Sequence, residues 1–182
     1  MATMPAMSVE ELLALPEDGL RHELLDGEHV VSPTPRLAHQ RAVRELYRVL
    51  EPLVRNRDDV ELFCVPGDLR LNARTVVEPD LFLLPSLPGP RVQDWAAAPI
   101  PLLVVEVLSP STAARDRGQK RRLYLDAGVE EYWIVDLDAR VIERWRGGES
   151  RPEILEVALQ FALDVGVTGS INLAEFFGEV LR

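Results

Sequence analysis

The chain has 182 residues, of which 47% are hydrophobic and 27% charged, which fits one globular domain spanning residues 1–182 without a linker. Its formal net charge of −10 argues against a protein that coats nucleic acid through bulk electrostatic attraction. No apolar run is long enough to span a membrane, and the acidic N-terminus is unlike a signal peptide. The single cysteine, Cys64, fits a buried thiol in a reducing cytoplasm.

The first third of the chain predicts a hairpin and a long helix. Asp26-Gly27 lies between two runs of alternating apolar and polar residues, which is a strong signal of a β-hairpin. Glu23 lies on the first strand of this hairpin. Apolar residues at helical spacing then predict a helix from about Arg36 to Arg55. His39 lies in its first turn, where it could face a site, although an exposed side chain is the favoured interpretation.

The middle of the chain predicts three strands, a long loop and a buried strand. The three strands are expected at Val60–Val65, Asp68–Leu71 and Val76–Leu84. A proline-rich loop from Pro85 to Pro101 follows, either as the rim of a functional site or as a neutral connector. Leu102–Leu108 is nearly all apolar, which predicts a central strand covered on both faces.

The last third predicts a parallel strand pair and a peripheral hairpin. A helix from Thr112 to about Asp126, ended by Gly128, separates the strand Leu102–Leu108 from a second apolar strand, Glu131–Asp136. Strand, helix and strand in this order predict a parallel pair with a right-handed crossover. The fold class is therefore α/β, with a mixed central sheet flanked by helices. The remaining expected elements are an antiparallel hairpin (Arg140–Arg146 and Pro152–Ala158) and a final helix (Leu173–Leu181).

Two carboxylates interrupt the apolar strands. Asp80 follows Pro79 within one apolar run, and Glu106 lies in the middle of another, 106 − 80 = 26 residues later. Burying an ionised carboxylate is costly unless a cation or hydrogen bonds compensate it. Mg²⁺ and Mn²⁺ take oxygen ligands, commonly one or two carboxylates, so the pair suggests a metal site. Without a metal, the repulsion between Asp80 and Glu106 should destabilise the protein. Backbone groups or an arginine would satisfy the same carboxylates without a metal.

Longer motifs surround these carboxylates. They are HELLDGE, EPDLFLL, LLVVEVLSPST and GVEEYWIVD, with Asp116, Lys120 and Tyr124 between the last two. Together with the order of the elements, they resemble the PD-(D/E)XK nuclease superfamily, which has the restriction-endonuclease-like fold. Over nearly its whole length the chain is similar to the bacterial branch of Uma-type putative restriction endonucleases, and the run from Glu106 to Asp136 is the most specific part.

The resemblance implies hydrolysis of phosphodiester bonds, most simply in DNA, with Mg²⁺ or Mn²⁺ as the cofactor. Asp80 and Glu106 would hold the metal together with the backbone carbonyl of Val107. Glu23 matches the early acidic position of the branch and would complete the catalytic set, although an exposed hairpin glutamate explains it equally well. Because no recognition domain is appended, sequence specificity would come from loops or from the second protomer of a homodimer.

The chain departs from the superfamily at one position. The lysine usually found two residues after the glutamate is Leu108 here, and leucine cannot stabilise charge. Lys120 is the natural catalytic substitute, since Asp116, Lys120 and Tyr124 are spaced to share one face of a helix, where Asp116 would hold the ammonium. The alternative is a surface ion pair between Asp116 and Lys120 with little energetic weight.

The residues leave three functions open. A nuclease acting on DNA is favoured by the paired carboxylates, and the basic run from Arg115 to Arg122 offers phosphate contacts through Arg121 or Arg122. This run is equally well explained as a solvated helix face. The absent lysine and the acidic total favour a non-catalytic module that keeps the nuclease fold for binding or assembly. A metal hydrolase with a different substrate is the third possibility.

Overall fold

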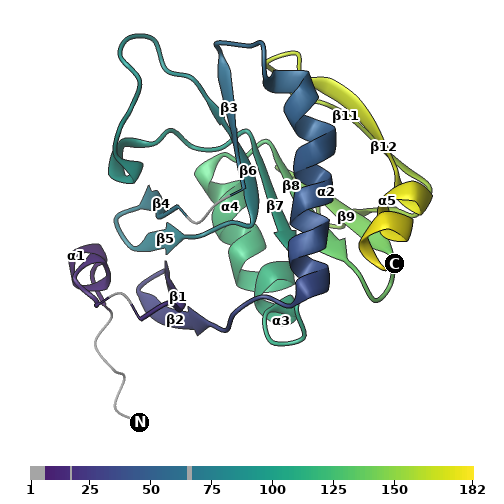
Figure 1. The fold of residues 1–182 in the computed structure, drawn as a ribbon. Coiled ribbons are helices and arrows are strands. Elements are labelled where there is room, and N and C mark those ends of the chain that lie inside the picture. Colours follow the sequence, from purple (N-terminus) through teal and green to yellow (C-terminus); the bar gives the residue numbers. More distant parts are fainter. Residues whose placement is uncertain (1–6, 17, 65–66) are drawn as a thin grey trace.

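A computed structural model describes residues 7–16, 18–64 and 67–182, and its centre is a six-stranded mixed sheet (Figure 1). The strand order is β10-β9-β8-β7-β6-β3. Neighbouring strands are antiparallel except β7 and β8, which pair in parallel from Leu103↔Glu131 to Val107↔Val135. The predicted parallel pair and mixed sheet are therefore confirmed. The strands are β3 (Val60–Phe63), β6 (Leu81–Pro85), β7 (Leu103–Val107), β8 (Glu131–Asp136), β9 (Val141–Arg146) and β10 (Glu153–Leu155).

The crossover between β7 and β8 is one helical segment with an irregular middle. It consists of α3 (Ala113–Arg115), a π-helical turn η2 (Asp116–Lys120) and α4 (Arg121–Ala127). Gly128 ends it at φ 99°, in the left-handed region that favours glycine. The predicted helix is present, but the π turn breaks its regular spacing. Such turns are rare and often accompany functional sites.

A second sheet of four antiparallel strands, in the order β2-β1-β5-β4, lies beside the first. Its hairpin turns at Asp26 and Gly27, whose φ values of 54° and 85° match the predicted tight turn. The single strand predicted from Val76 to Leu84 is wrong. It is two strands in two sheets, interrupted at residues 78–80, because Pro79 has no N–H to donate to a strand partner. The strands are β1 (Arg21–Leu25), β2 (Glu28–Ser32), β4 (Leu69–Asn72) and β5 (Thr75–Val77).

Both faces of the central sheet are covered, as its apolar strands require. One face, from which Val105 projects, is covered by two helices and a hairpin. These are α2 (Leu37–Val54), α5 (Leu173–Val180) and the hairpin β11–β12 (Ala158–Ala162, Thr168–Asn172). The crossover helix and the small sheet cover the other face, where Val104 lies. Helix α1 (Val9–Leu13) packs on β1. Among the described residues, no helix has the length and apolar character needed to cross a bilayer.

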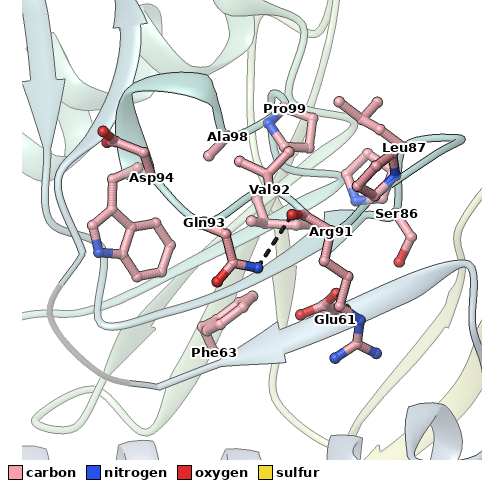
Figure 2. A pocket seen from close by; sticks show the side chains of 14 residues that line it. Glu61, Phe63, Ser86, Leu87, Arg91, Val92, Gln93, Asp94, Ala98 and Pro99 are labelled. Atoms are coloured by element: carbon pink, nitrogen blue, oxygen red, sulfur yellow. Dashed lines mark hydrogen bonds and ion pairs between the residues drawn. The ribbon is translucent and has the colours of Figure 1, made fainter.

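The proline-rich loop after β6 forms a cavity of about 350 Å³ of its own (Figure 2). Trp95, in the short 3₁₀ turn η1 (Trp95–Ala97), packs edge-on against Phe63 and Phe82. The cavity lies at the Pro85 end of β6, whereas Asp80 precedes the other end of that strand. It is therefore separate from the predicted site. Cys64, expected to be buried, is half-buried against the core.

Candidate active site

Asp80 and Glu106 face the same cavity because of the register between β6 and β7. These antiparallel strands pair Leu81 with Val105, so the next position in the same register places Asp80 opposite Glu106. Facing residues of an antiparallel pair project from the same side of the sheet. Both side chains are nearly buried, with residue exposures of 5% and 3%. They line a cavity of about 310 Å³ that is also lined by Arg21, Glu23, Arg36, His39, Val107, Thr112, Asp116 and Lys120.

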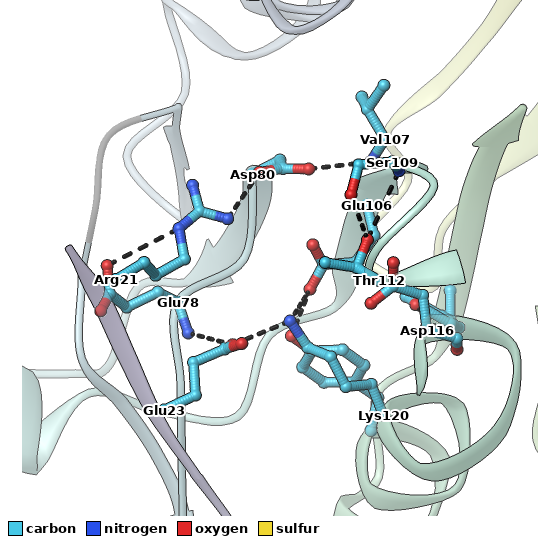
Figure 3. Close-up of polar contacts among 12 residues, drawn as sticks. Arg21, Glu23, Glu78, Asp80, Glu106, Val107, Ser109, Thr112, Asp116 and Lys120 are labelled. Carbon is cyan, nitrogen blue, oxygen red and sulfur yellow. Dashed lines mark hydrogen bonds and ion pairs between the residues drawn. The ribbon is translucent and has the colours of Figure 1, made fainter. Parts of the chain in front are cut away.

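Asp80 is held by three donors, of which Figure 3 shows the Arg21 guanidinium and the Val107 backbone N–H. Its Oδ1 accepts a hydrogen bond of 2.8 Å from Arg21 Nη1, and its Oδ2 accepts one of 2.8 Å from the backbone N–H of Val107. His39 Nε2 lies 2.9 Å from the same Oδ2. Burial alone would raise the pKa of Asp80, but His39, Arg21 and the Val107 N–H together lower it to about 2. The carboxylate is thus stabilised in its charged form.

His39 is therefore not the exposed side chain that the sequence predicts. It is 7% exposed, because it lies on the stripe of α2 that also buries Val43 and Leu46 against the sheet. This stripe begins one turn earlier than its apolar residues suggest. The Nδ1 atom of His39 is buried without a hydrogen-bond partner among the described residues.

Glu106 contacts the crossover segment. Its Oε1 lies 2.6 Å from Lys120 Nζ and accepts a hydrogen bond of 2.8 Å from the Tyr124 hydroxyl. Burial raises the pKa of Glu106 to about 8; Lys120 opposes this shift, while the nearby carboxylates, Asp80 and Asp116 among them, add to it. Glu106 thus favours a bound proton in a site where Asp80 favours a charge.

Glu23 belongs to the same cluster and is not the exposed hairpin glutamate that the sequence left open. It is 2% exposed, and its Oε1 accepts hydrogen bonds from Lys120 Nζ at 2.8 Å and from the backbone N–H of Glu78 at 3.0 Å. Strand β1 therefore brings a third carboxylate to the cavity from the small sheet. The break between β5 and β6 supplies the backbone donor at Glu78.

Lys120 lies between two carboxylates and is almost completely buried. Only 3% of the residue is exposed, and the charges of Glu106 and Glu23 raise its pKa, which burial alone would lower. Among the described residues Asp116 forms no ion pair with Lys120 within 4.0 Å, so it does not hold the ammonium directly as predicted; its nearby charge only helps to raise the pKa of Lys120. The π turn between the two residues breaks their regular helical spacing.

Lys120 is also the only lysine of the chain, which has 19 arginines. Elsewhere the protein meets its need for positive charge with arginine. A lysine at this one position fits a buried site that requires a compact ammonium, because an arginine fork is larger and planar. This count is a signal in the sequence that points to Lys120 independently of any motif.

The charges of the cluster do not balance within the protein. Glu23, Asp80 and Asp116 carry three negative charges when ionised, while Glu106 favours a proton, and Arg21 and Lys120 carry two positive charges, which leaves 2 − 3 = −1. A divalent cation bound beside Glu106 would favour its ionised form, and the resulting charge of 2 − 4 = −2 is the charge that this cation would neutralise. The oxygen donors are also of the type that Mg²⁺ and Mn²⁺ prefer. The residues therefore fit such a metal in charge and chemistry.

Their present geometry favours internal cations instead. Among the described residues, no group of three or more His, Cys, Asp or Glu side chains is arranged to hold a metal ion. Asp80 is directed at Arg21 and His39, and Glu106 at Lys120. Metal binding would thus require these carboxylates to exchange protein partners for the ion.

The basic run from residue 115 to 122 is largely used inside the protein. Arg117 pairs with Asp136 and Glu143 at 2.7 and 2.6 Å. The Arg121 guanidinium lies 4.3 Å from the ring centre of Trp145, in a cation–π contact. Of the two arginines predicted to hold phosphates, Arg122 is the exposed one.

Sequence reasoning missed Arg21 as a site residue. Its Nη1 lies 2.8 Å from Asp80 Oδ1 and its Nε lies 3.9 Å from Glu78 Oε2. Arg21 is the first residue of β1, directly before His22. Arg21 and Glu23 alternate with His22, so both point to the same face of the strand. That alternation around the expected Glu23 was the available signal.

An antiparallel pair that presents two facing carboxylates, followed by a parallel crossover, defines a protein of the restriction-endonuclease-like class. The family model described as "Uma2: Putative restriction endonuclease" matches residues 9–169. The chain therefore belongs to the Uma2 family, as its motifs predicted.

Two further proteins are similar to the chain. The uncharacterized protein slr1290 of Synechocystis sp. is 37% identical over 78 residues, which cover 36% of this chain and 41% of that protein. A crystal structure described as a putative nuclease belonging to DUF820, from Anabaena variabilis, superposes with a TM-score of 0.78. Its sequence identity is 17%, and the match covers 96% of this chain and 99% of the other. It confirms the fold of the chain.

Proposed function

We propose that this protein is a nuclease that hydrolyses phosphodiester bonds in DNA with a divalent cation, Mg²⁺ or Mn²⁺. The observation that carries the proposal is the meeting of Asp80, Glu106, Glu23 and Lys120 in one cavity from the start of β6, β7, β1 and the crossover segment. Burying four acids with too few cations is costly, so a cluster of this kind is rarely kept for stability alone. Membership of the Uma2 family supports the same reaction class.

The residues have distinct roles in this proposal. Asp80 and Glu106 would hold the cation together with the backbone carbonyl of Val107, whose N–H already donates to Asp80. When bound, the cation would polarise the scissile phosphate and lower the pKa of a water molecule. Glu23 positions Lys120, and Lys120 would offset negative charge that develops on the phosphate. Tyr124 orients Glu106 through its hydroxyl.

The second candidate is a non-catalytic module for binding or assembly. It is favoured by Leu108, which removes the usual strand-borne lysine, and by the internal cations that now occupy the carboxylates. A scaffold of this kind has no reason to bind a metal in the cavity. Metal binding therefore separates the two candidates.

The test combines titration and cleavage. Calorimetric titration with Mg²⁺ and Mn²⁺ should show binding to the wild type that is lost in Glu106→Ala. Incubation with plasmid DNA, DNA oligonucleotides and RNA should then give metal-dependent cleavage by the wild type alone. Binding without cleavage of any substrate would favour the non-catalytic module or another substrate, and no binding at millimolar metal would contradict the metal site.

Two further expectations belong to the proposal. A cytoplasmic location is supported by the single cysteine, which precludes an internal disulfide. A homodimer stays a prediction, and sedimentation velocity of the purified protein measures it directly.

A further inference from the structure

Helix α2 carries a concentration of positive charge that the proposed reaction does not use. Residues 36–55 contain five arginines and two glutamates, which gives 5 − 2 = +3 in a chain whose total is −10. The five arginines are Arg36, Arg41, Arg44, Arg48 and Arg55. The basic run on the crossover is mostly paired within the protein. On α2, Glu45 pairs with Arg44 and Arg48 and Glu51 pairs with Arg55, which still leaves a surplus of three positive charges on the helix.

Arg44, Arg48 and Arg55 are exposed to solvent, whereas Arg41 is half-buried and donates to the Arg182 carbonyl. The opposite face of the helix is buried through Ala42, Leu46 and Leu50. The side chains of Arg44 and Arg48 are 63% and 67% exposed, so they lose little hydration and keep donors free for a partner. Figure 1 shows α2 as an outer layer over the central sheet, with no other helix in front of it.

Glu45 arranges two of these arginines side by side. Its Oε1 accepts from Arg44 Nη2 at 2.7 Å and its Oε2 from Arg48 Nη1 at 2.8 Å. One carboxylate thus fixes two guanidinium groups on successive turns and leaves a net charge of 2 − 1 = +1. A cationic pair that is already ordered loses less side-chain entropy when it binds an anion. Four residues along a helix correspond to a rise of about 6 Å, which suits a regularly charged chain.

Helix α2 starts at the cavity and leads away from it. Arg36 and His39 line the cavity, and α2 continues for 18 residues, which is about 27 Å. A polymer with one phosphate group in the cavity could therefore place its neighbouring phosphates along the helix. A mononucleotide would reach only Arg36.

We propose that the exposed arginines of α2 form a phosphate track that holds the backbone of a nucleic-acid polymer on one side of the scissile bond. This inference rests on the proposed nuclease function and names its substrate as a polymer rather than a single nucleotide. The track contacts phosphates, so it positions the strand without reading its sequence. It also explains how a chain with a net charge of −10 attracts nucleic acid locally.

The test measures binding in the presence of a chelator, so that no cleavage occurs. Fluorescence anisotropy is recorded with labelled 20-nucleotide and 5-nucleotide DNA, over a range of salt concentrations. The variant Arg44→Gln/Arg48→Gln should bind the long DNA about tenfold or more weakly at low salt, with a slope of log K against log salt that falls by about 1.4 to 1.8. Its affinity for the short DNA should change little.

Two matched variants control for bulk charge and for folding. Arg70→Gln/Arg151→Gln removes the same charge from exposed positions outside α2 and should bind like the wild type. Arg44→Lys/Arg48→Lys keeps the charge and should retain most of the affinity and salt slope. Melting temperatures confirm that each variant is folded.

Three results would overturn the track. One is equal binding of long DNA by the wild type and the Arg44→Gln/Arg48→Gln variant, and another is the same loss in the control outside α2. Equally tight binding of polyglutamate would assign the surface to acidic proteins instead. The proposed reaction can fail separately, because absence of cleavage with every metal would leave length-dependent binding in chelator intact.

Discussion

The Lys120 ammonium lies 2.6 Å from Glu106 Oε1, although the residue two positions after Glu106 is Leu108. The cation thus reaches the strand carboxylate from the crossover segment rather than from the strand. The π turn that ends at Lys120 and the paired Glu23 set this geometry. If Lys120 replaces the absent strand lysine, it acts from a buried position.

The first prediction concerns turnover. Lys120→Met should lower cleavage of any substrate found by about a hundredfold or more, because it removes a preorganised charge near the phosphate. It also leaves Glu23 and Glu106 without their cation, which costs ~3–5 kcal/mol of stability for a buried pair. The double variant Glu23→Gln/Lys120→Met also removes one of the two unpaired negative charges, so it should recover part of that stability while staying inactive.

Arg122→Met is the comparison for this prediction. Arg122 is exposed on the same helix, so its loss should raise KM more than it lowers kcat. Unchanged turnover in a folded Lys120→Met variant would contradict the replacement and favour the non-catalytic module. Steady-state kinetics and melting curves decide the matter.

The structure reverses the stability effect that the sequence suggests for Asp80. Repulsion from Glu106 predicts that Asp80→Asn stabilises the metal-free protein, but Arg21, His39 and the Val107 N–H hold the charged form, and the pKa is about 2. A carboxyl group whose folded pKa lies below its ordinary value of 3.8 stabilises the protein above that value, and this stability is lost as the pH falls toward 2. Asp80→Asn should therefore destabilise the protein by ~2 kcal/mol at neutral pH.

Chemical denaturation with and without Mg²⁺ checks this prediction. Mg²⁺ should raise the melting temperature of the wild type by mass action, and the shift should be smaller in Asp80→Asn. An equal shift in both proteins would exclude Asp80 as a metal ligand. A more stable Asp80→Asn protein would show that the Arg21 contact does not compensate the buried charge.

For Glu106 we expect the opposite dependence of stability on pH. Its folded pKa of about 8 lies above its ordinary value of 4.5, so the folded state keeps a proton that the unfolded state has released. Glu106 therefore makes the wild type lose stability as the pH rises from 4.5 to 8, by at most ~1.4 kcal/mol per pH unit. Glu106→Gln is neutral throughout and should lack this slope.

Urea denaturation of both proteins between pH 5 and 8.5 measures the difference. Glu106→Gln should gain stability over the wild type as the pH rises through this window. If the stabilities of the two proteins changed with pH in parallel, Lys120 would keep Glu106 ionised throughout this window. Any proton that the folded cluster retains would then lie on another acid.

Local sequence patterns predicted the elements that depend on local chemistry. The Asp26-Gly27 turn, the strand Glu131–Asp136 and the crossover all follow from residues close together in the chain. The break at residues 78–80 was missed, because the apolar residues on both sides of Glu78-Pro79-Asp80 were assigned to a single strand. This break matters, since it frees the Glu78 N–H for Glu23 and places Asp80 at the start of β6.

Contacts between distant segments were only partly predictable. Motifs identified Asp80, Glu106 and Lys120, but the pairing of Lys120 with Glu23 joins residues 97 positions apart. Arg21 and His39 were not assigned to the site, because nothing local to them reveals that Asp80 lies within hydrogen-bonding distance. The π turn likewise has no signature in the helical spacing that predicted the crossover.

The last prediction uses the fact that Lys120 is the only lysine of the chain. Amine acylation can therefore label only Lys120 and the α-amino group, which serves as an internal reference within each molecule. Burial and a raised pKa both protect Lys120, so at pH 8 the folded protein should acquire label at the α-amino group and almost none at Lys120. In denaturant both amines should react, and mass spectrometry of digested peptides separates the two.

A divalent cation that takes Glu106 from Lys120 should lower the pKa of the ammonium and speed its labelling, and Glu106→Ala should abolish this metal effect. Labelling of Lys120 in the folded, metal-free protein as fast as the α-amino group would show that the ammonium is exposed, and would rule out the buried Glu23–Lys120–Glu106 arrangement.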